Sequence, residues 1–100
     1  MTYGYIGSMK AKPGCRDEVV SMLVNGAADL RSAGCRLYVV SVSDADADLI
    51  SVSEAWDTKE RYDASRQLPE ATAVMAQAMP MLIGDVTRRE LTAPGQMSIG

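Results

Sequence analysis

The first segment with a clear hydrophobic pattern spans residues 3–12, where side chains alternate between two unlike faces. One face carries Tyr3, Tyr5, Gly7, Met9 and Ala11, whereas the other is mostly polar. A period of two residues predicts a β-strand. The Pro-Gly dipeptide that follows predicts the end of this strand.

The pattern then changes to a helical period over residues 16–32, where apolar residues recur every three or four positions. Asp17 and Glu18 fall in the first turn and Arg31 in the last, which suits the helix dipole at both ends. Gly34 fits the position just beyond a helix C-terminus. We therefore expect one helix across this whole segment.

Two apolar segments follow, at residues 35–43 and 48–57, joined by the short acidic sequence 44–47. A short polar connection between two strand-like segments predicts an antiparallel hairpin.

The second half of the chain predicts two helical pieces and a final strand. Thr58 can cap a short helix, and Pro69 marks a break before a second helix over residues 70–79. Pro80 is expected to end that helix because proline cannot continue a helical hydrogen-bond ladder. Residues 81–92 complete the pattern as a last strand.

The predicted order of elements is β-α-β-β-α-β, the ferredoxin-like arrangement of the α+β class. It implies one domain over residues 1–92, with a four-stranded antiparallel sheet and both helices on one face. Residues 93–100 are expected to form a flexible C-terminal tail. The other face of the sheet would stay uncovered and partly apolar, so we expect a homodimer in which a second copy covers it.

Composition limits the possible partners. The chain has a net charge of −3 and no cluster of Lys and Arg, so we expect no nucleic-acid partner. Apolar runs fall far short of the ~20 residues of a membrane helix, and no charged start precedes an apolar block. We therefore expect no membrane association and a cytoplasmic location.

In the reducing cytoplasm, Cys15 and Cys35 are expected to be free thiols.

The acidic connection spells Asp-x-Asp-x-Asp at Asp44, Asp46 and Asp48, a spacing found in calcium loops. A calcium loop also needs a glycine at its sixth position and a glutamate at its twelfth, which are Leu49 and Ala55 here. We interpret the segment as a solvated turn.

Several short motifs occur in a fixed order along the chain. They are Lys12-Pro13-Gly14, Gly34-Cys35-x-x-Tyr38, the acidic hairpin, Glu54-x-Trp56, Tyr62-Asp63-Ala64-Ser65 and Pro69-Glu70. With these motifs the chain resembles the antibiotic biosynthesis monooxygenase (ABM) family of dimeric α+β barrels over residues 4–90. The resemblance implies a dimeric α/β barrel and one of several activities. These include cofactor-free oxygenation of aromatic polyketides or hydroquinones, and haem degradation.

The sequence contains no histidine, which narrows these activities. A haem-degrading member would use a histidine to bind the iron, and histidine-containing metal triads are also excluded. Where many members carry two histidines, this chain has Ser65 and Glu70. We therefore expect neither a metal nor an organic cofactor.

Trp56 and Tyr62 are the predicted catalytic residues. In the oxygenase branch that the chain resembles, a tryptophan and a tyrosine at these positions line an aromatic-substrate pocket. One departure is Val52, where some members place a polar amide. The alternative is that both aromatics are ordinary core residues between sheet and helix.

Glu54 shares a strand face with apolar residues and Trp56, and a carboxylate in such surroundings can act as a general base. The alternative that we favour from the sequence is an ion pair with Arg36 or Lys10, across the sheet or across a dimer interface. The remaining substrate-binding candidates are residues that could form a pocket wall: Tyr5, Tyr38, Ser65, Met75 and Met79, with Met9 and Met81 as further methionines.

The resulting hypothesis is a cofactor-independent monooxygenase that oxidises a hydroquinone, naphthol or anthrone with O₂. The alternative hypothesis is a non-catalytic dimer of the same fold that binds a small apolar or aromatic ligand, or one associated with stress. A pure assembly module, with its interior filled by side chains, is a third possibility.

Overall fold

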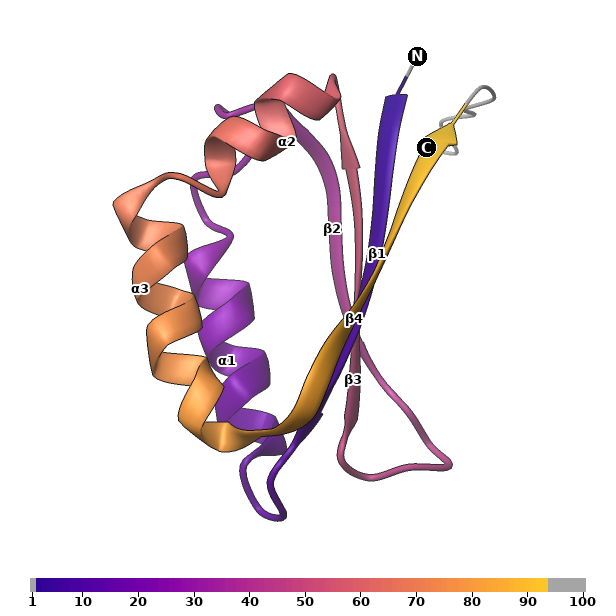
Figure 1. Cartoon of the computed structure of the whole chain (residues 1–100), viewed down its shortest axis with the longest axis vertical. Coiled ribbons are helices and arrows are strands. Elements are labelled where there is room, and N and C mark those ends of the chain that lie inside the picture. Colours follow the sequence, from indigo (N-terminus) through magenta and orange to yellow (C-terminus); the bar gives the residue numbers. More distant parts are fainter. Residues whose placement is uncertain (1, 94–100) are drawn as a thin grey trace.

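The computed structural model describes residues 2–93 and shows the expected α+β arrangement, an antiparallel sheet with helices on one face (Figure 1). The strand order across the sheet is β2-β3-β1-β4, which is the ferredoxin-like topology. The elements are β1 (Thr2–Ala11), α1 (Arg16–Gly26), β2 (Cys35–Val42), β3 (Leu49–Trp56), α2 (Lys59–Ser65), α3 (Pro69–Ala78), the 3₁₀ helix η1 (Met79–Met81) and β4 (Leu82–Ala93). The predicted fold class is thus confirmed.

The helix predicted over residues 16–32 is wrong in its second half, because α1 ends at Gly26 and a series of turns follows. Asn25 and Gly26 are poor helix formers, and neither provides an apolar side chain that would hold another turn. Gly26 also faces α3, where an added Cβ would lie 2.7 Å from Val74 Cγ2. The glycine therefore lets the two helices pack closely at the point where the first one ends.

The predicted helical pieces after the hairpin are confirmed. The Thr58 side chain caps α2 by accepting a hydrogen bond from the Arg61 backbone N–H at 3.1 Å. Helix α3 starts at Pro69, where a missing N–H costs nothing. Pro80 ends α3 as expected, but through one turn of 3₁₀ helix before β4 begins. The predicted tail lies outside the described residues apart from Ala93, which belongs to β4.

The core lies between the sheet and the helices. The buried positions of β1 are the face predicted from its alternation, from Tyr3 through Ala11. On β3, Ile50, Val52 and Trp56 are buried on the same side of the sheet. The core is therefore one layer of side chains between sheet and helices, and the site described below opens within this layer.

Among residues 2–93, no helix covers the opposite face of the sheet (Figure 1). Its exposed apolar side chains come from all strands except β3: Ile6, Leu37, Val39, Ile83 and Leu91. Small residues of β1 and β3, including Gly4 and Ala55, lie between Leu91 and Leu37 in the sheet register. This face is thus partly apolar, with small residues between its larger side chains.

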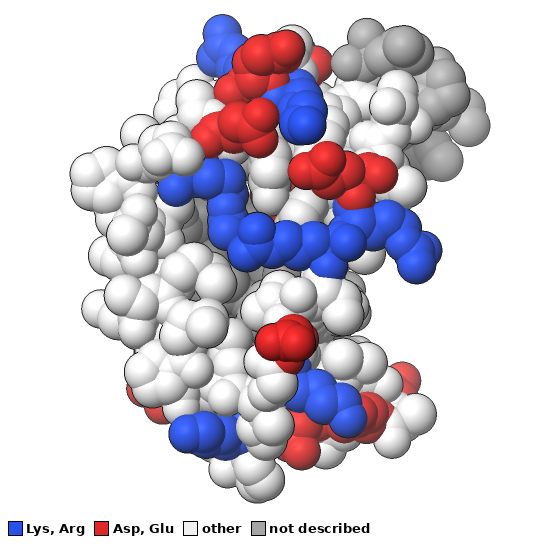
Figure 2. Space-filling model, in the orientation of Figure 1, with Lys and Arg blue, Asp and Glu red and all other residues white. Residues whose placement is uncertain are grey.

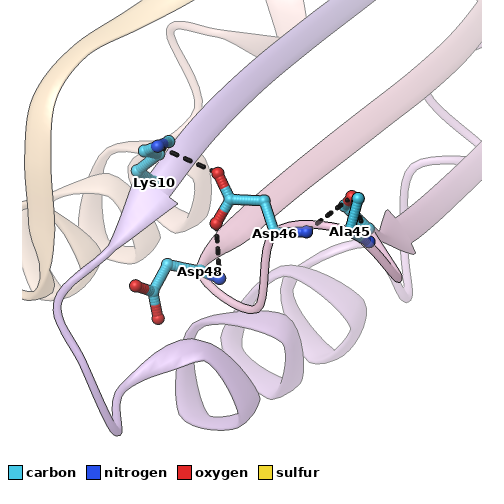
Figure 3. Close-up of polar contacts among 5 residues, drawn as sticks. Lys10, Ala45, Asp46 and Asp48 are labelled. Atoms are coloured by element: carbon cyan, nitrogen blue, oxygen red, sulfur yellow. Dashed lines mark hydrogen bonds and ion pairs between the residues drawn. The ribbon is translucent and has the colours of Figure 1, made fainter.

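The acidic hairpin is held by local polar contacts (Figure 3). Lys10 Nζ lies 2.9 Å from Asp46 Oδ2, and the Asp48 N–H donates to Asp46 Oδ1 at 3.0 Å. The Lys10 ammonium thereby holds the pKa of the Asp46 carboxyl below its usual value. Within residues 2–93, no group of three or more His, Cys, Asp or Glu side chains is placed to hold a metal ion. The hairpin is a solvated turn, as its sequence predicted.

The two thiols are free, as expected. Cys35 is buried and its Sγ lies 3.2 Å from the Leu37 carbonyl oxygen, whereas Cys15 precedes α1 and is partly exposed. In the described part of the chain, no helix is long and apolar enough to cross a membrane.

Candidate active site

Two adjoining cavities, of about 70 and 40 Å³, lie between the sheet and the helices. Their shared wall is formed by Leu23 of α1, Tyr38 of β2, Glu54 of β3, Arg66 after α2 and Met75 of α3. The larger cavity extends toward apolar residues of α1 and α3. The smaller one extends along β1 and β4. Together they form a site with an apolar part and a polar part, joined at Glu54.

Most of the predicted site residues line this space. Trp56 and Ser65 line the larger cavity, Tyr5 lines the smaller one, and Tyr38, Glu54 and Met75 line both. Met9 also borders the smaller cavity, whereas Met81 packs against the core.

Met79 is a correction to the predicted site. Its side chain is 54% exposed and borders neither cavity. Met79 directly follows α3 and its N–H still donates to the Met75 carbonyl, so it lies one helical turn beyond Met75, at the exposed end of the helix.

Tyr62 does not line the cavities, although it belongs to the aromatic cluster behind them. Its ring centroid lies 5.1 Å from those of Tyr3 and Tyr5 and 5.8 Å from that of Trp56. The Trp56 contact is edge-to-face, at 76° between the ring planes. Such contacts between aromatic rings stabilise the packing and fix ring orientation. Tyr62 therefore holds Tyr5 and Trp56 in place at the cavity wall.

Glu54 lies at the centre of the site. In the sheet register it stands opposite Tyr5 on β1 and opposite Tyr38 on β2, so a phenol flanks it on either side. Its Oε1 accepts a hydrogen bond from Trp56 Nε1 at 3.0 Å. Burial raises the pKa of the Glu54 carboxyl, and the Trp56 hydrogen bond and the Arg66 guanidinium offset only part of that rise. The carboxylate is thus held in place and kept more basic than usual.

The ion pair that we favoured for Glu54 is not formed within the described chain. Arg36 pairs with Asp57 and Lys10 pairs with Asp46 instead. Glu54 points to the helix side of the sheet, whereas Lys10 lies on the other side. The alternation of side chains along β3 places Glu54 on the same side of the sheet as Trp56, which is the side away from Lys10.

Sequence reasoning missed two cationic residues, Arg66 and Arg88. Arg66 lies one helical turn after Tyr62 and borders both cavities. Arg88 stands opposite Gly7 in the register and borders the smaller cavity. Figure 2 shows basic side chains lying across the hollow between the helices and the sheet. Val86 and Arg88 share one face of the last strand, and Val86 packs against the core. This alternation is the sequence signal from which the position of Arg88 could have been predicted.

Gly7 provides room for Tyr5. A Cβ added at Gly7 would lie 2.8 Å from the Tyr5 hydroxyl oxygen and 3.1 Å from Cε1, so the Tyr5 ring lies directly over this glycine. Gly7→Ala is expected to displace the ring and to lower the free energy of unfolding by about 1–3 kcal/mol, the usual cost of overpacking. Urea unfolding followed by circular dichroism measures this loss. In a Tyr5→Phe background the alanine should cost less, because the closest clashing atom is gone. An equal cost in both backgrounds would contradict this packing.

Comparisons with known proteins agree with this architecture. Residues 2–77 match the family model for antibiotic biosynthesis monooxygenase. A candidate antibiotic biosynthesis monooxygenase from Chloroflexus aurantiacus J-10-fl is 36% identical, with 100% of each chain covered and a TM-score of 0.88. A second candidate, from Deinococcus radiodurans, is 22% identical over 100% of this chain and 99% of that one, with a TM-score of 0.82. Among curated proteins, none matches this sequence.

The fold and the match over three-quarters of the sequence define an α+β protein with the ferredoxin-like arrangement. The chain belongs to the antibiotic biosynthesis monooxygenase family. At 22% identity, the structural match to the protein from Deinococcus radiodurans supports the fold alone.

Proposed function

We propose that this protein is a cofactor-independent monooxygenase that oxidises a small aromatic hydroxyl compound of the hydroquinone, naphthol or anthrone type with O₂. The single observation that supports this most strongly is Glu54, a desolvated carboxylate fixed by Trp56 between two phenols at the wall of a cavity. A carboxylate with a raised pKa is suited to remove a proton from a weakly acidic substrate. The family to which the chain belongs supports the same class of reaction.

The reaction needs no external reductant. For an anthrone, Glu54 removes one proton from the CH₂ group between the two aromatic rings, which leaves a carbanion stabilised as a phenolate. The carbanion carbon bonds to O₂ after electron transfer, which gives a hydroperoxide once the terminal oxygen takes up a proton. The carbon then loses its second proton while the O–O bond breaks, so that C=O forms and the other oxygen leaves as water. The substrate supplies all four electrons.

The cavity walls define the other roles. Tyr38, Tyr5 and Trp56 present aromatic surface to a flat substrate. Burial raises the pKa of the Tyr38 hydroxyl, and the charge of Glu54 raises it further, so this phenol stays protonated and can donate to a substrate oxygen. Tyr62 supports Tyr5 and Trp56 from behind.

The size of the cavities favours a second candidate, a non-catalytic dimer that binds a small ligand. Cavities of about 70 and 40 Å³ are below the ~300–1,000 Å³ of most ligand sites. A bicyclic substrate therefore requires side chains to rearrange, and Met75 is the adaptable one on the shared wall. A small ligand would need less rearrangement.

Oxygen uptake distinguishes the two functions. The metal-stripped protein is offered hydroquinones, naphthols and anthrones, with the spontaneous rate subtracted and Tyr38→Phe measured alongside. We expect uptake with at least one compound, reduced in the variant. Uptake at the spontaneous rate with every compound would contradict the monooxygenase and leave the binding dimer as the better account.

We also propose that the uncovered face of the sheet is the interface of a homodimer. Exposed apolar side chains on β1, β2 and β4 surround small residues there, and Arg89 is a charged side chain on this face. Isologous interfaces use the same patch on both subunits, so one sequence can supply both halves. Burying this patch would remove apolar surface that a monomer rarely exposes.

Val39→Glu is expected to convert the dimer into a monomer, because it places a charge within the apolar part of the interface. The matched control is Val24→Glu on α1, since Val24 is 53% exposed and Val39 is 41% exposed. Light scattering at micromolar concentration should show a dimer for the wild type and the control, and a monomer for Val39→Glu. A monomeric wild type would refute the interface.

A further inference from the structure

The charged groups that border the two cavities are Glu54, Arg66 and Arg88. They come from β3, from the turn after α2 and from β4. The residues that α1 and α3 contribute to these walls are all uncharged. With Glu54 ionised, the site therefore holds one positive charge in excess.

Neither guanidinium has an ion-pair partner among residues 2–93. The ion pairs found there involve Lys10, Arg16, Arg36 and Lys59. Glu90 is the acidic residue two positions beyond Arg88 on the same face of β4, and it pairs with Lys59 at 3.7 Å. Arg31 and Arg61, which also form no ion pair among these residues, border other hollows, whereas Arg66 and Arg88 both border the cavity that Glu54 lines.

Arg66 lies near Glu54 but does not form an ion pair with it. The guanidinium is near enough to lower the pKa of Glu54, yet the two groups form no ion pair within 4.0 Å. Burial raises the pKa values of the Tyr38 and Tyr62 hydroxyls, and the nearby charge of Arg66 offsets part of that rise. A half-buried arginine with an acid close by but not in contact leaves room between them for a ligand atom.

Gly7 shapes the wall on the other side. Because Gly7 carries no side chain, the Tyr5 ring lies over it and brings its hydroxyl to the wall of the smaller cavity that Arg88 also borders. The polar part of the site thus contains two guanidinium groups and the Tyr5 phenol. The apolar part, toward Leu30, Ala71 and Val74, is uncharged and suits the ring of an aromatic ligand in its chemistry.

From this arrangement we infer that the ligand is an anionic aromatic: a hydroxyl compound that also carries a carboxylate, bound by Arg66 and Arg88. The ring occupies the apolar part, the carboxylate lies between the two guanidinium groups, and the hydroxyl faces Glu54. One ligand carboxylate together with Glu54 balances the two arginines. Guanidinium groups bind carboxylates through paired, charge-assisted hydrogen bonds. This inference rests on the proposed function for the identity of the site, and it adds the class of substrate.

Binding measured by calorimetry tests the inference without any need for turnover. The probes are 1-hydroxy-2-naphthoate and 1-naphthol, which differ only by the carboxylate. The variants are Arg66→Gln, Arg88→Gln and the double variant. Arg89→Gln is the matched control, because Arg89 is the next residue on β4 and faces the opposite side of the sheet, across from Ile6.

The wild type should bind the naphthoate about tenfold or more tightly than the naphthol, which corresponds to about 1.4 kcal/mol. This preference should shrink in each single variant, disappear in the double variant and persist in Arg89→Gln. The preference of the wild type for the naphthoate should also weaken as salt is added, since salt screens charged groups near solvent. Equal binding of the two compounds, a preference unchanged in the double variant, or no binding of either would overturn the inference. Selective naphthoate binding without oxygen uptake would support the anionic ligand and contradict the monooxygenase.

Discussion

Glu54→Gln is expected to lower the rate of oxygen uptake by about 10²–10⁴-fold, the usual contribution of a general base. Glutamine keeps the shape of the side chain and can still accept the hydrogen bond from Trp56 Nε1, so the cavity should remain intact. Glu60→Gln is the matched control, because Glu60 lies at the exposed start of α2 outside the two cavities. Uptake by Glu54→Gln at the wild-type rate would show that another group removes the proton.

The dependence of oxygen uptake on pH tests the role of Glu54 independently. A general base acts only when deprotonated, so activity should rise with pH through the pKa of Glu54. Because burial raises that pKa, the rise should occur above the ordinary carboxyl value of about 4.3. Replacing Arg66 with glutamine should move the rise to still higher pH, since the guanidinium favours the charged carboxylate.

The raised pKa also predicts how stability depends on pH. A carboxyl whose pKa is higher in the folded than in the unfolded state favours folding when protonated, and that contribution is lost as pH rises through the folded-state value. The free energy of unfolding of Glu54→Gln relative to wild type should therefore increase from about pH 4 to pH 7. Urea unfolding at several pH values measures it. A constant difference would contradict the desolvated position of the carboxyl.

Trp56→Ala is expected to have the largest effect on stability, a loss of about 3–5 kcal/mol. Trp56 is 1% exposed, packs edge-to-face on Tyr62 and fixes Glu54 by its indole N–H. Domains of this size have total stabilities of roughly 5–15 kcal/mol, so this variant should be close to unfolding. Trp56 is the single tryptophan of the chain, so far-UV circular dichroism is the suitable probe.

Trp56→Phe separates packing from hydrogen bonding. Phenylalanine retains most of the buried surface but cannot donate to Glu54, whose pKa should then rise further because the Trp56 hydrogen bond lowers it. The variant should fold, and its activity should appear at higher pH than that of the wild type. An unchanged pH profile would mean that the indole N–H has no part in tuning Glu54.

Most of the fold could be predicted from the sequence because its patterns are local. The alternation of residues 3–12 gave the buried face of β1, and Thr58 and Pro69 marked the starts of α2 and α3. The end of α1 could not be predicted in the same way. Apolar residues continue at helical spacing to Leu30, and only the approach of Val74 on α3 shows why Gly26 is needed where it is.

The sequence could predict those site residues that lie together on one face of a strand. Glu54 and Trp56 share a side of β3, and Tyr5 and Tyr38 stand opposite Glu54 through the sheet register. Arg66 was not found, because its place at the cavity depends on how α2 is set against the sheet. Such tertiary placement leaves no local signal in the sequence.

Isotope labelling of the product formed from anthrone under ¹⁸O₂ is the most direct test of the proposed reaction. Wild-type protein should place one labelled atom in the new carbonyl and release the other as water, and Glu54→Gln should form the labelled product far more slowly. Release of the oxygen as hydrogen peroxide, or equally fast labelling by Glu54→Gln, would contradict a monooxygenase centred on Glu54.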